Sequence, residues 1–218
     1  MRLTTVFAAF GCLLLGVLGP GCGGGGGGTS SIAVCSLDSF TPNYATKVSH
    51  LLNWNSFPLR VFFVQDANFS QARRVLALAG FDQWVTASNS TISYSEVSTT
   101  ANADITVTFD PTTQNGVTQI RFQGLNMVSA EMGLGVKNQT DMDLMCIASH
   151  EFGHAIGIDG HSDIEADLMY PIHFIGTVCP VTARDLNTIK TGYCHLFGRA
   201  IREQFKRPTG PVQTKIIQ

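Results

Sequence analysis

The strongest constraint on the fold is a pair of histidines, His150 and His154, in a segment with clear helix start and stop signals. Residues 140–143, Thr-Asp-Met-Asp, fit a capping box and bring acidic side chains into the first helical turn. Gly157 stands where a glycine commonly ends a helix. Because four residues make slightly more than one turn, both imidazole rings must leave the same face of this helix. The chain must therefore fold so that one helix presents two histidines together.

The two histidines belong to the pattern H-E-x-x-H, which is typical of a zinc site. Two ring nitrogens at about 2.0–2.1 Å from one ion form a natural zinc pair. Glu151 follows the first histidine, and we predict that it takes a proton from the activated water as a general base. The alternative is a chance match in which His150 and His154 are ordinary helical histidines, but the helix signals agree with the motif.

A third ligand is expected just beyond the helix, because a catalytic zinc has three protein ligands and one open position. The glycine that ends the helix would let the backbone turn through a left-handed conformation, so that His161 returns toward the pair. We therefore predict that His161 completes the metal site with His150 and His154. Asp159 or Asp163 is the alternative third ligand.

Residues 167–171, Asp-Leu-Met-Tyr-Pro, extend the pattern. With them the region resembles the metzincin metallopeptidases, in which H-E-x-x-H-x-x-G-x-x-H precedes a methionine-containing turn, the Met-turn. Within this group, a His-Ser pair with Met-Tyr-Pro eight residues after the histidine is similar to the matrixins, and His161 and Met169 have that spacing. Residues 152–155 and 182–187 are also matrixin-like.

One residue departs from the family pattern. The usual third histidine lies six residues after the second, but here Gly160 holds that place and His161 follows it. We interpret Gly160 as a one-residue insertion, because the spacing from His161 to Met169 is intact and glycine lets a loop bulge without steric cost. The strong similarity covers residues 150–193, and a weaker one reaches back to Trp54.

The resemblance implies an α+β fold of the metzincin-like zincin type, with a mixed twisted sheet, a zinc-binding active-site helix, a Met-turn and a C-terminal helix. It implies a zinc endopeptidase in which Glu151 acts as base and then as acid, while Met169 forms an apolar floor beneath the metal. It also implies that a protein or peptide substrate binds extended along an exposed sheet edge, which we expect at residues 127–135. Structural calcium or a second zinc, common in matrixins, is left open.

Hydrophobic patterns in the rest of the chain independently predict an α+β fold with one mixed sheet and few helices. β-branched and aromatic residues predict strands at 58–64, 92–97, 104–109, 117–122 and 127–135. Apolar periodicity predicts further helices at 69–87 and 182–192, the second with Thr182 as its N-cap.

The composition excludes a protein that binds nucleic acid through its charge. The chain has 14 Lys and Arg residues against 16 Asp and Glu residues, a net charge of −2, and so offers no basic face. Its apolar share of 44% is enough for a sizeable core. We expect a monomeric catalytic domain at residues 45–198 and a basic, partly disordered tail at residues 199–218.

The N-terminal residues are typical of an export signal. Residues 1–21 combine a charged start with an apolar middle, as in secretory signal peptides. Cys22 follows in a context that resembles a bacterial lipoprotein signal, and the glycine run at 23–28 predicts a flexible tether. We therefore interpret residues 22–44 as a tether or short pro-segment. We expect a cell-envelope or outer-membrane lipoprotein that touches the membrane only through Cys22, and the alternative is plain secretion.

Four cysteines remain in the exported domain, an even number that predicts two disulfides in an oxidising compartment. They are Cys35, Cys146, Cys179 and Cys194. Of the three pairings available, we favour Cys179–Cys194, which would close a short segment, and by default Cys35–Cys146. The alternative is four buried free thiols.

Two other functions stay open at this point. The chain could be a surface-anchored binding module that keeps the zinc scaffold without cleaving, although such a module has no chemical need for Glu151. It could also be a gluzincin-like peptidase with Glu165 as third ligand, although the spacing of His161 and Met169 disfavours that reading.

Overall fold

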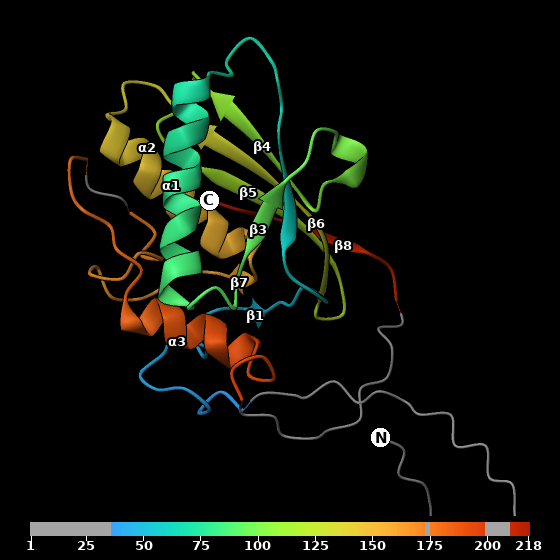
Figure 1. Ribbon diagram of the computed structural model, residues 1–218. Helices are drawn as coiled ribbons and strands as arrows, with labels where there is room; N and C mark the ends of the chain where they lie inside the picture. Colours follow the sequence, from blue (N-terminus) through green and yellow to red (C-terminus); the bar gives the residue numbers. More distant parts are fainter. Residues whose placement is uncertain (1–35, 173–174, 199–209) are drawn as a thin grey trace, which may run out of the picture.

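The computed structural model describes residues 36–172, 175–198 and 210–218, and its centre is one six-stranded sheet (Figure 1). The strands of this sheet are β2 (Leu59–Phe63), β3 (Tyr94–Glu96), β4 (Ile105–Asp110), β5 (Val117–Gln123), β6 (Asn126–Gly135) and β8 (Gln213–Ile217). Their order is β3-β2-β4-β6-β5-β8. The pairs among β3, β2, β4 and β6 are parallel, whereas β5 is antiparallel to both β6 and β8. The sheet is therefore mixed, as predicted.

Helices supply the other half of the α+β fold. They are α1 (Gln71–Ala87), α2 (Asp141–Ala155) and α3 (Ala183–Gly192), with one 3-10 turn, η1 (Thr100–Asn102). α1 and α2 pack against each other, and Trp84 Nε1 of α1 donates to the Ser149 carbonyl of α2 at 2.8 Å. The rings of Phe81 and Phe152 stack across the same contact with centroids 4.4 Å apart. α2 also packs on β5 and β6, while Phe81 of α1 stacks on Phe63 of β2 with ring centroids 6.2 Å apart, so both helices pack on the sheet.

The predicted strands and helices all form, with ends shifted by up to two residues. Ile105, Val107 and Phe109 are buried on one face of β4, as their alternation predicts. Two short strands that no pattern predicted, β1 (His50–Leu51) and β7 (Ile158–Asp159), form a separate antiparallel pair. This pair ties the residues that follow α2 to the N-terminal part of the domain.

One expectation about the sheet is wrong. Residues 127–135 are expected at an exposed edge, but β6 lies between β4 and β5, because interior and edge strands share the same alternation. Within the predicted basic tail at 199–218, residues 213–217 form β8 on β5. A sheet edge offers a row of unpaired backbone groups, and pairing with it orders a segment that composition alone suggests is solvated. Residues 199–209 lie outside the described residues.

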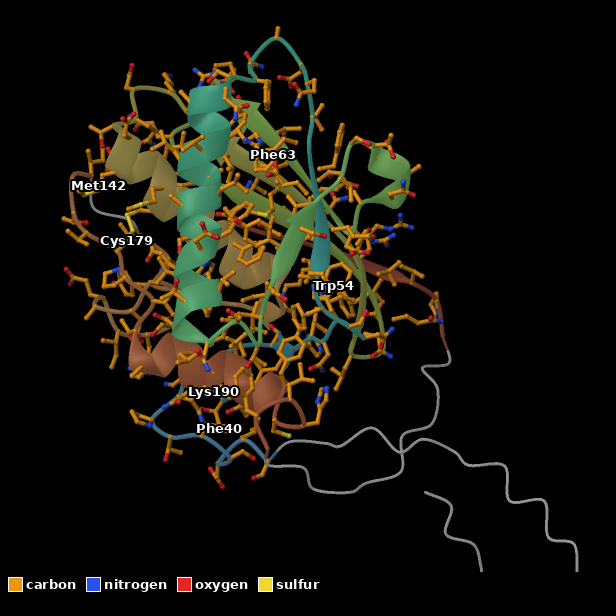
Figure 2. All side chains as sticks on the ribbon, in the orientation of Figure 1. Phe40, Trp54, Phe63, Met142, Cys179 and Lys190 are labelled. Carbon is orange, nitrogen blue, oxygen red and sulfur yellow. A yellow bond between two sulfur atoms is a disulfide. The ribbon has the colours of Figure 1, made fainter. Side chains whose placement is uncertain are left out.

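The packed part of the chain begins before residue 45, where the catalytic domain is predicted to start. Tyr44 is buried, and its hydroxyl donates to Asp185 of α3 at 2.7 Å. Phe40 lies with its ring 6.0 Å from Lys190 Nζ, also on α3 (Figure 2). This end of the predicted tether therefore packs against the domain.

The predicted signal peptide at 1–21, the lipidation site Cys22 and the glycine run lie outside the described residues. Within the ranges that are described, no helix combines the length and apolar character needed to cross a membrane.

The predicted disulfide pairing is wrong. Cys146 of α2 is bonded to Cys179, with their Cα atoms 5.6 Å apart (Figure 2). Cys194 is also disulfide-bonded, and Cys35 lies outside the described residues. The first bond excludes both Cys179–Cys194 and Cys35–Cys146, as well as four free thiols. Closeness in sequence favoured Cys179–Cys194. Folding instead brings Cys179 next to Cys146 on α2, which lies 33 residues earlier in the chain.

Candidate metal centre

The histidine-bearing helix begins and ends as its sequence predicts. The Thr140 hydroxyl accepts from the Asp143 N–H, and the Asp143 side chain accepts from the Thr140 N–H, which completes a capping box. α2 ends at Ala155, and Gly157 adopts a φ of +125°. A Cβ at this position would also collide with the Leu52 carbonyl, so glycine is required both for the turn and for the close approach.

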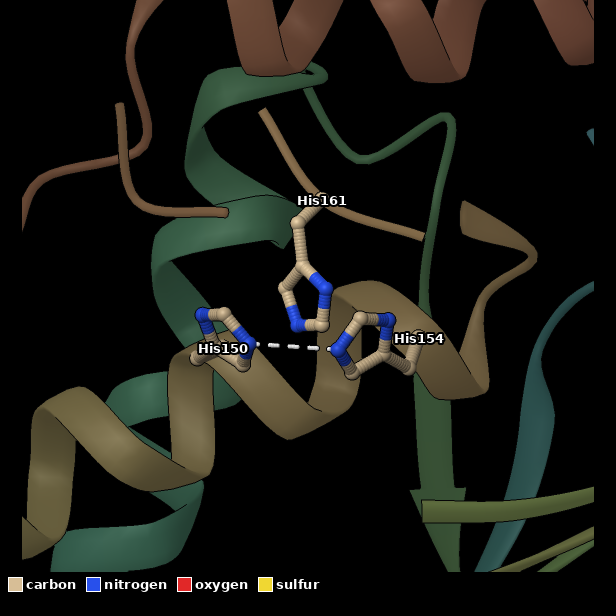
Figure 3. Close-up of side chains that lie close together, drawn as sticks. All are labelled: His150, His154 and His161. Carbon is tan, nitrogen blue, oxygen red and sulfur yellow. Dashed lines mark hydrogen bonds between the residues drawn. The ribbon is translucent and has the colours of Figure 1, made fainter. Parts of the chain in front are cut away.

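The three predicted ligands lie together. His150 and His154 leave the same face of α2, and His161 faces them from the following loop (Figure 3). The Nε2 atoms of His150 and His154 are 3.1 Å apart, and the ligand atoms of all three rings lie within 4.8 Å of one another. Nitrogens that each bind one tetrahedral zinc at about 2.0–2.1 Å are about 3.3 Å apart. Among the described residues, no other group of three or more His, Cys, Asp or Glu side chains is placed to share a metal ion.

Hydrogen bonds on the far side of two rings determine their tautomers. Nδ1 of His150 lies 2.8 Å from the Leu168 carbonyl oxygen, and Nδ1 of His154 lies 2.8 Å from the Ile158 carbonyl oxygen. Since a carbonyl oxygen only accepts, each Nδ1 carries a proton, and Nε2 of each neutral ring presents a lone pair. Two facing lone pairs cannot bond to each other, whereas a shared cation stabilises this arrangement.

Burial favours the neutral form of His154 and His161, the form that metal ligation requires. It lowers the pKa of His154 well below its ordinary value, and the neighbouring histidines lower that pKa further. The pKa of His161 is lowered by burial and, to a lesser extent, by Lys215. Nε2 of His161 is buried without a hydrogen-bond partner. Leaving a polar atom in that state costs free energy unless a ligand satisfies it.

The alternative third ligands interact elsewhere. Asp159 pairs with His50 Nδ1 at 2.8 Å and with Lys215 Nζ at 2.5 Å. Asp163 forms surface ion pairs with two cations, each at 3.2 Å. Glu165 is exposed and does not belong to the histidine group. The structure therefore brings His161, and none of these carboxylates, to the pair on α2.

The loop that carries His161 is held at both ends. β7 pairs with β1 directly after α2, and Gly160 then adopts a φ of +145°, which favours glycine. On the other side, the Ser162 N–H donates to the Met169 carbonyl at 2.8 Å. Gly160 thus provides a bend directly before His161.

Glu151 points from α2 toward the start of β5. Its side chain is buried, and the Thr118 hydroxyl donates to its Oε2 at 2.6 Å. Gly116 lies so close that an added Cβ would be 2.6 Å from the carboxyl carbon of Glu151. Burial raises the pKa of Glu151 to about 8, and the bond from Thr118 opposes that rise. The carboxyl group is thus held between a hydroxyl donor and a bare glycine backbone.

Met169 lies on the Met-turn and packs against α2. A Cβ on Gly153 would collide with the Met169 sulfur and come within 2.9 Å of Trp84 Cζ2, so glycine permits this packing. Asp185 of α3 stabilises the Met-turn. Its carboxylate accepts hydrogen bonds from the Leu168 N–H at 2.9 Å and from the Met169 N–H at 3.3 Å.

A cleft of about 580 Å³ opens beside His150. His150 and Glu151 of α2 line it, together with the β4–β5 loop and the residues that follow the Met-turn. Gln218, which follows β8, lines the same cleft. The candidate metal site therefore faces a groove rather than a closed interior.

Sequence reasoning missed the residues that position Glu151. Thr118 is 33 residues away from it, and nothing in the local pattern marks Thr118 or Gly116 as its neighbours. Asp185 lies within the matrixin-like stretch at 182–187, so the resemblance offered a signal for its role in holding the Met-turn.

Comparison with known proteins agrees with the geometry. A family model described as matrixin matches residues 61–194. Matrix metalloproteinase-25 of Mus musculus is 35% identical over 75 residues, which are 34% of this chain and 12% of that protein. The match to this relative is therefore confined to a small part of its length. The family match confirms the predicted metzincin-like α+β fold.

Proposed function

Since the chain belongs to the matrixin family, whose model covers more than half of its 218 residues, we propose that it is a zinc-dependent endopeptidase that hydrolyses peptide bonds. The observation that carries this proposal is the convergence of His150, His154 and His161 beside the buried carboxyl group of Glu151. The three histidines are the proposed metal ligands, and the glutamate is the proposed base.

The donor set fits zinc better than it fits a hard cation. Neutral imidazole nitrogens suit zinc, whereas magnesium and calcium prefer oxygen ligands. The group has three ligand atoms, which leaves one tetrahedral position for water or substrate, as in catalytic rather than structural sites. When bound, zinc supplies Lewis-acid chemistry that activates water and polarises the scissile carbonyl.

Glu151 is proposed to accept a proton from the attacking water and to pass it to the departing amide nitrogen. The Thr118 hydroxyl engages Oε2 and fixes the plane of the carboxyl group. That contact leaves Oε1 as the oxygen that exchanges the proton. Holding the carboxyl group in one orientation lowers the entropic cost of reaching the reactive geometry.

Export is proposed from the N-terminal sequence, with Cys22 as the point of lipid attachment. The Cys146–Cys179 disulfide supports this location, because disulfides persist in oxidising compartments outside the cytosol. Replacing Cys22 by alanine should release the protein from the membrane fraction, and unchanged attachment would exclude lipid anchoring.

Metal analysis combined with digestion of a peptide library tests the proposed activity. The chain should hold one zinc, and Glu151→Gln should keep that zinc while losing hydrolysis by at least about 100-fold, the usual effect of removing a general base. Hydrolysis that survives in Glu151→Gln would refute the mechanism. A zinc-loaded chain that cleaves nothing would instead favour the non-catalytic binding module.

A further inference from the structure

We propose that β8 occupies the sheet edge on which an extended peptide substrate docks, so that substrate and β8 compete for the same surface of β5. This inference rests on the proposed function, because it names the surface that the substrate uses. The surface is the outer edge of β5, and its occupant in the folded chain is the segment 213–218.

The pairing gives the first reason. Five residues of β8 pair antiparallel with β5, from Phe122 opposite Gln213 to Thr118 opposite Ile217. The other side of β5 is already paired with β6. β8 therefore covers the edge of β5 that β6 does not pair with. An extended peptide adds to a sheet at such an edge.

The position of this edge gives the second reason. Thr118, which pairs with Ile217, is the residue whose hydroxyl holds Glu151. The next residue, Gln218, lines the cleft together with Glu151 and His150. A peptide that follows β5 toward its N-terminal end is thus led directly to the proposed catalytic groups, and β8 takes that path (Figure 1).

The contacts of β8 give the third reason, because they are few and lie on alternate residues. Ile217 is only 5% exposed, whereas Ile216 is 59% exposed. Lys215 Nζ contacts Asp159 at 2.5 Å and Ser49 Oγ at 3.1 Å. Gln213 and Thr214 are exposed. Besides its backbone hydrogen bonds, β8 is therefore held mainly by one apolar side chain and one ion pair. A competing peptide can form the same backbone hydrogen bonds to β5.

Competition of this kind lowers apparent affinity without altering the catalytic groups. A segment tethered to its site acts at an effective concentration of about 1 mM. If such a segment binds with a dissociation constant of about 0.1 mM, an added peptide binds about tenfold more weakly than to the uncovered edge. Weakening β8 should therefore strengthen peptide binding by about that factor.

The test weakens β8 in the zinc-loaded chain and measures hydrolysis of a quenched fluorescent peptide. Lys215→Ala combined with Ile217→Ala removes both side-chain contacts, and we expect kcat/KM to rise about tenfold, mainly through KM. Ile216→Ala is the matched control, because it removes an exposed isoleucine from the same strand. It should leave kcat/KM unchanged. An unchanged kcat/KM in the double variant would overturn the proposal.

A binding measurement separates this proposal from the proposed function. In a Glu151→Gln background, a dye-labelled peptide with the sequence of residues 213–218 should bind the Lys215→Ala, Ile217→Ala chain at least tenfold more tightly than the chain with β8 intact, as fluorescence anisotropy would show. A scrambled peptide should show no such difference. If no variant hydrolyses peptides, the proposed function fails, and this binding ratio alone decides the role of β8. Equal affinity for both chains would overturn it. If the double variant does not fold, Ile217→Ala alone replaces it in the same measurement, and equal affinity would again overturn the proposal.

Discussion

Replacing Gly116 with alanine should disable the site without unfolding the protein. Gly116 directly precedes β5, and its φ does not lie in the positive region, so its backbone accepts alanine. The added Cβ would lie 2.6 Å from the carboxyl carbon of Glu151, whereas ordinary contacts begin at 3.4 Å. The carboxyl group must therefore move by at least about 0.8 Å, the difference between these two distances, away from the position where Thr118 holds it.

This displacement sets the expected size of the effect. Misplacing a reacting group by about 1 Å costs about 100-fold in rate, so kcat/KM should fall by about that factor, or about 2.7 kcal/mol of transition-state stabilisation. The nearest atoms to the new methyl group all belong to Glu151, a flexible side chain. The free energy of unfolding should thus change by less than about 1 kcal/mol.

The assay compares kcat/KM, zinc content and urea unfolding for Gly116→Ala and the unsubstituted chain. Gly192→Ala is a control on α3, where the added Cβ would meet Leu51 Cβ at 3.3 Å, away from the cleft. We expect the control to keep its activity and Gly116→Ala to keep its zinc. Full activity in Gly116→Ala would refute the assigned position of the carboxyl group, and activity lost together with zinc would refute the assigned cause.

Three further changes test other parts of the site. Thr118→Val removes the hydroxyl donor at constant shape, so it should lower kcat about fivefold while KM and zinc content stay the same, because one hydrogen bond is worth about 1 kcal/mol. An unchanged kcat would count against a positioning role. His161→Ala should weaken zinc binding by more than about 100-fold, since even residues that only support a metal ligand contribute about 10–100-fold. Zinc titration with a chromogenic chelator measures the affinity, and an unaltered affinity would point to Asp159 or Asp163 as the third ligand. Asp185→Ala leaves the buried Tyr44 hydroxyl and the N–H groups of the Met-turn without their acceptor. It should therefore lower the free energy of unfolding, measured in urea, by about 3 kcal/mol. A loss below about 1 kcal/mol would mean that α3 does not hold the turn.

The candidate site could be predicted from the sequence where its residues are neighbours along the chain. His150 and His154 share a face because helix geometry places residues four apart together, whatever surrounds the helix. The capping residues at 140–143 and the glycine after α2 act within a single turn of backbone, and the structure contains both. His161 followed from the same local bend, although its neighbours include residues that only folding brings near.

The predictions that failed all concern partners from distant parts of the chain. Alternation identified β6 as a strand, but its place inside the sheet depends on which strands pair on either side. The Cys146–Cys179 bond depends on where the chain lies after the Met-turn, and spacing along the sequence does not determine it.

The sequence by itself determined the metal-binding helix, its two histidines and the bend toward the third, because bond geometry and hydrogen bonds within a turn dictate these features. Only the tertiary structure decided that Thr118 and Gly116 hold Glu151 and that β8 covers the edge of β5. These contacts join segments that are far apart in the chain, so they form only when the whole sheet has assembled, and no local pattern records them.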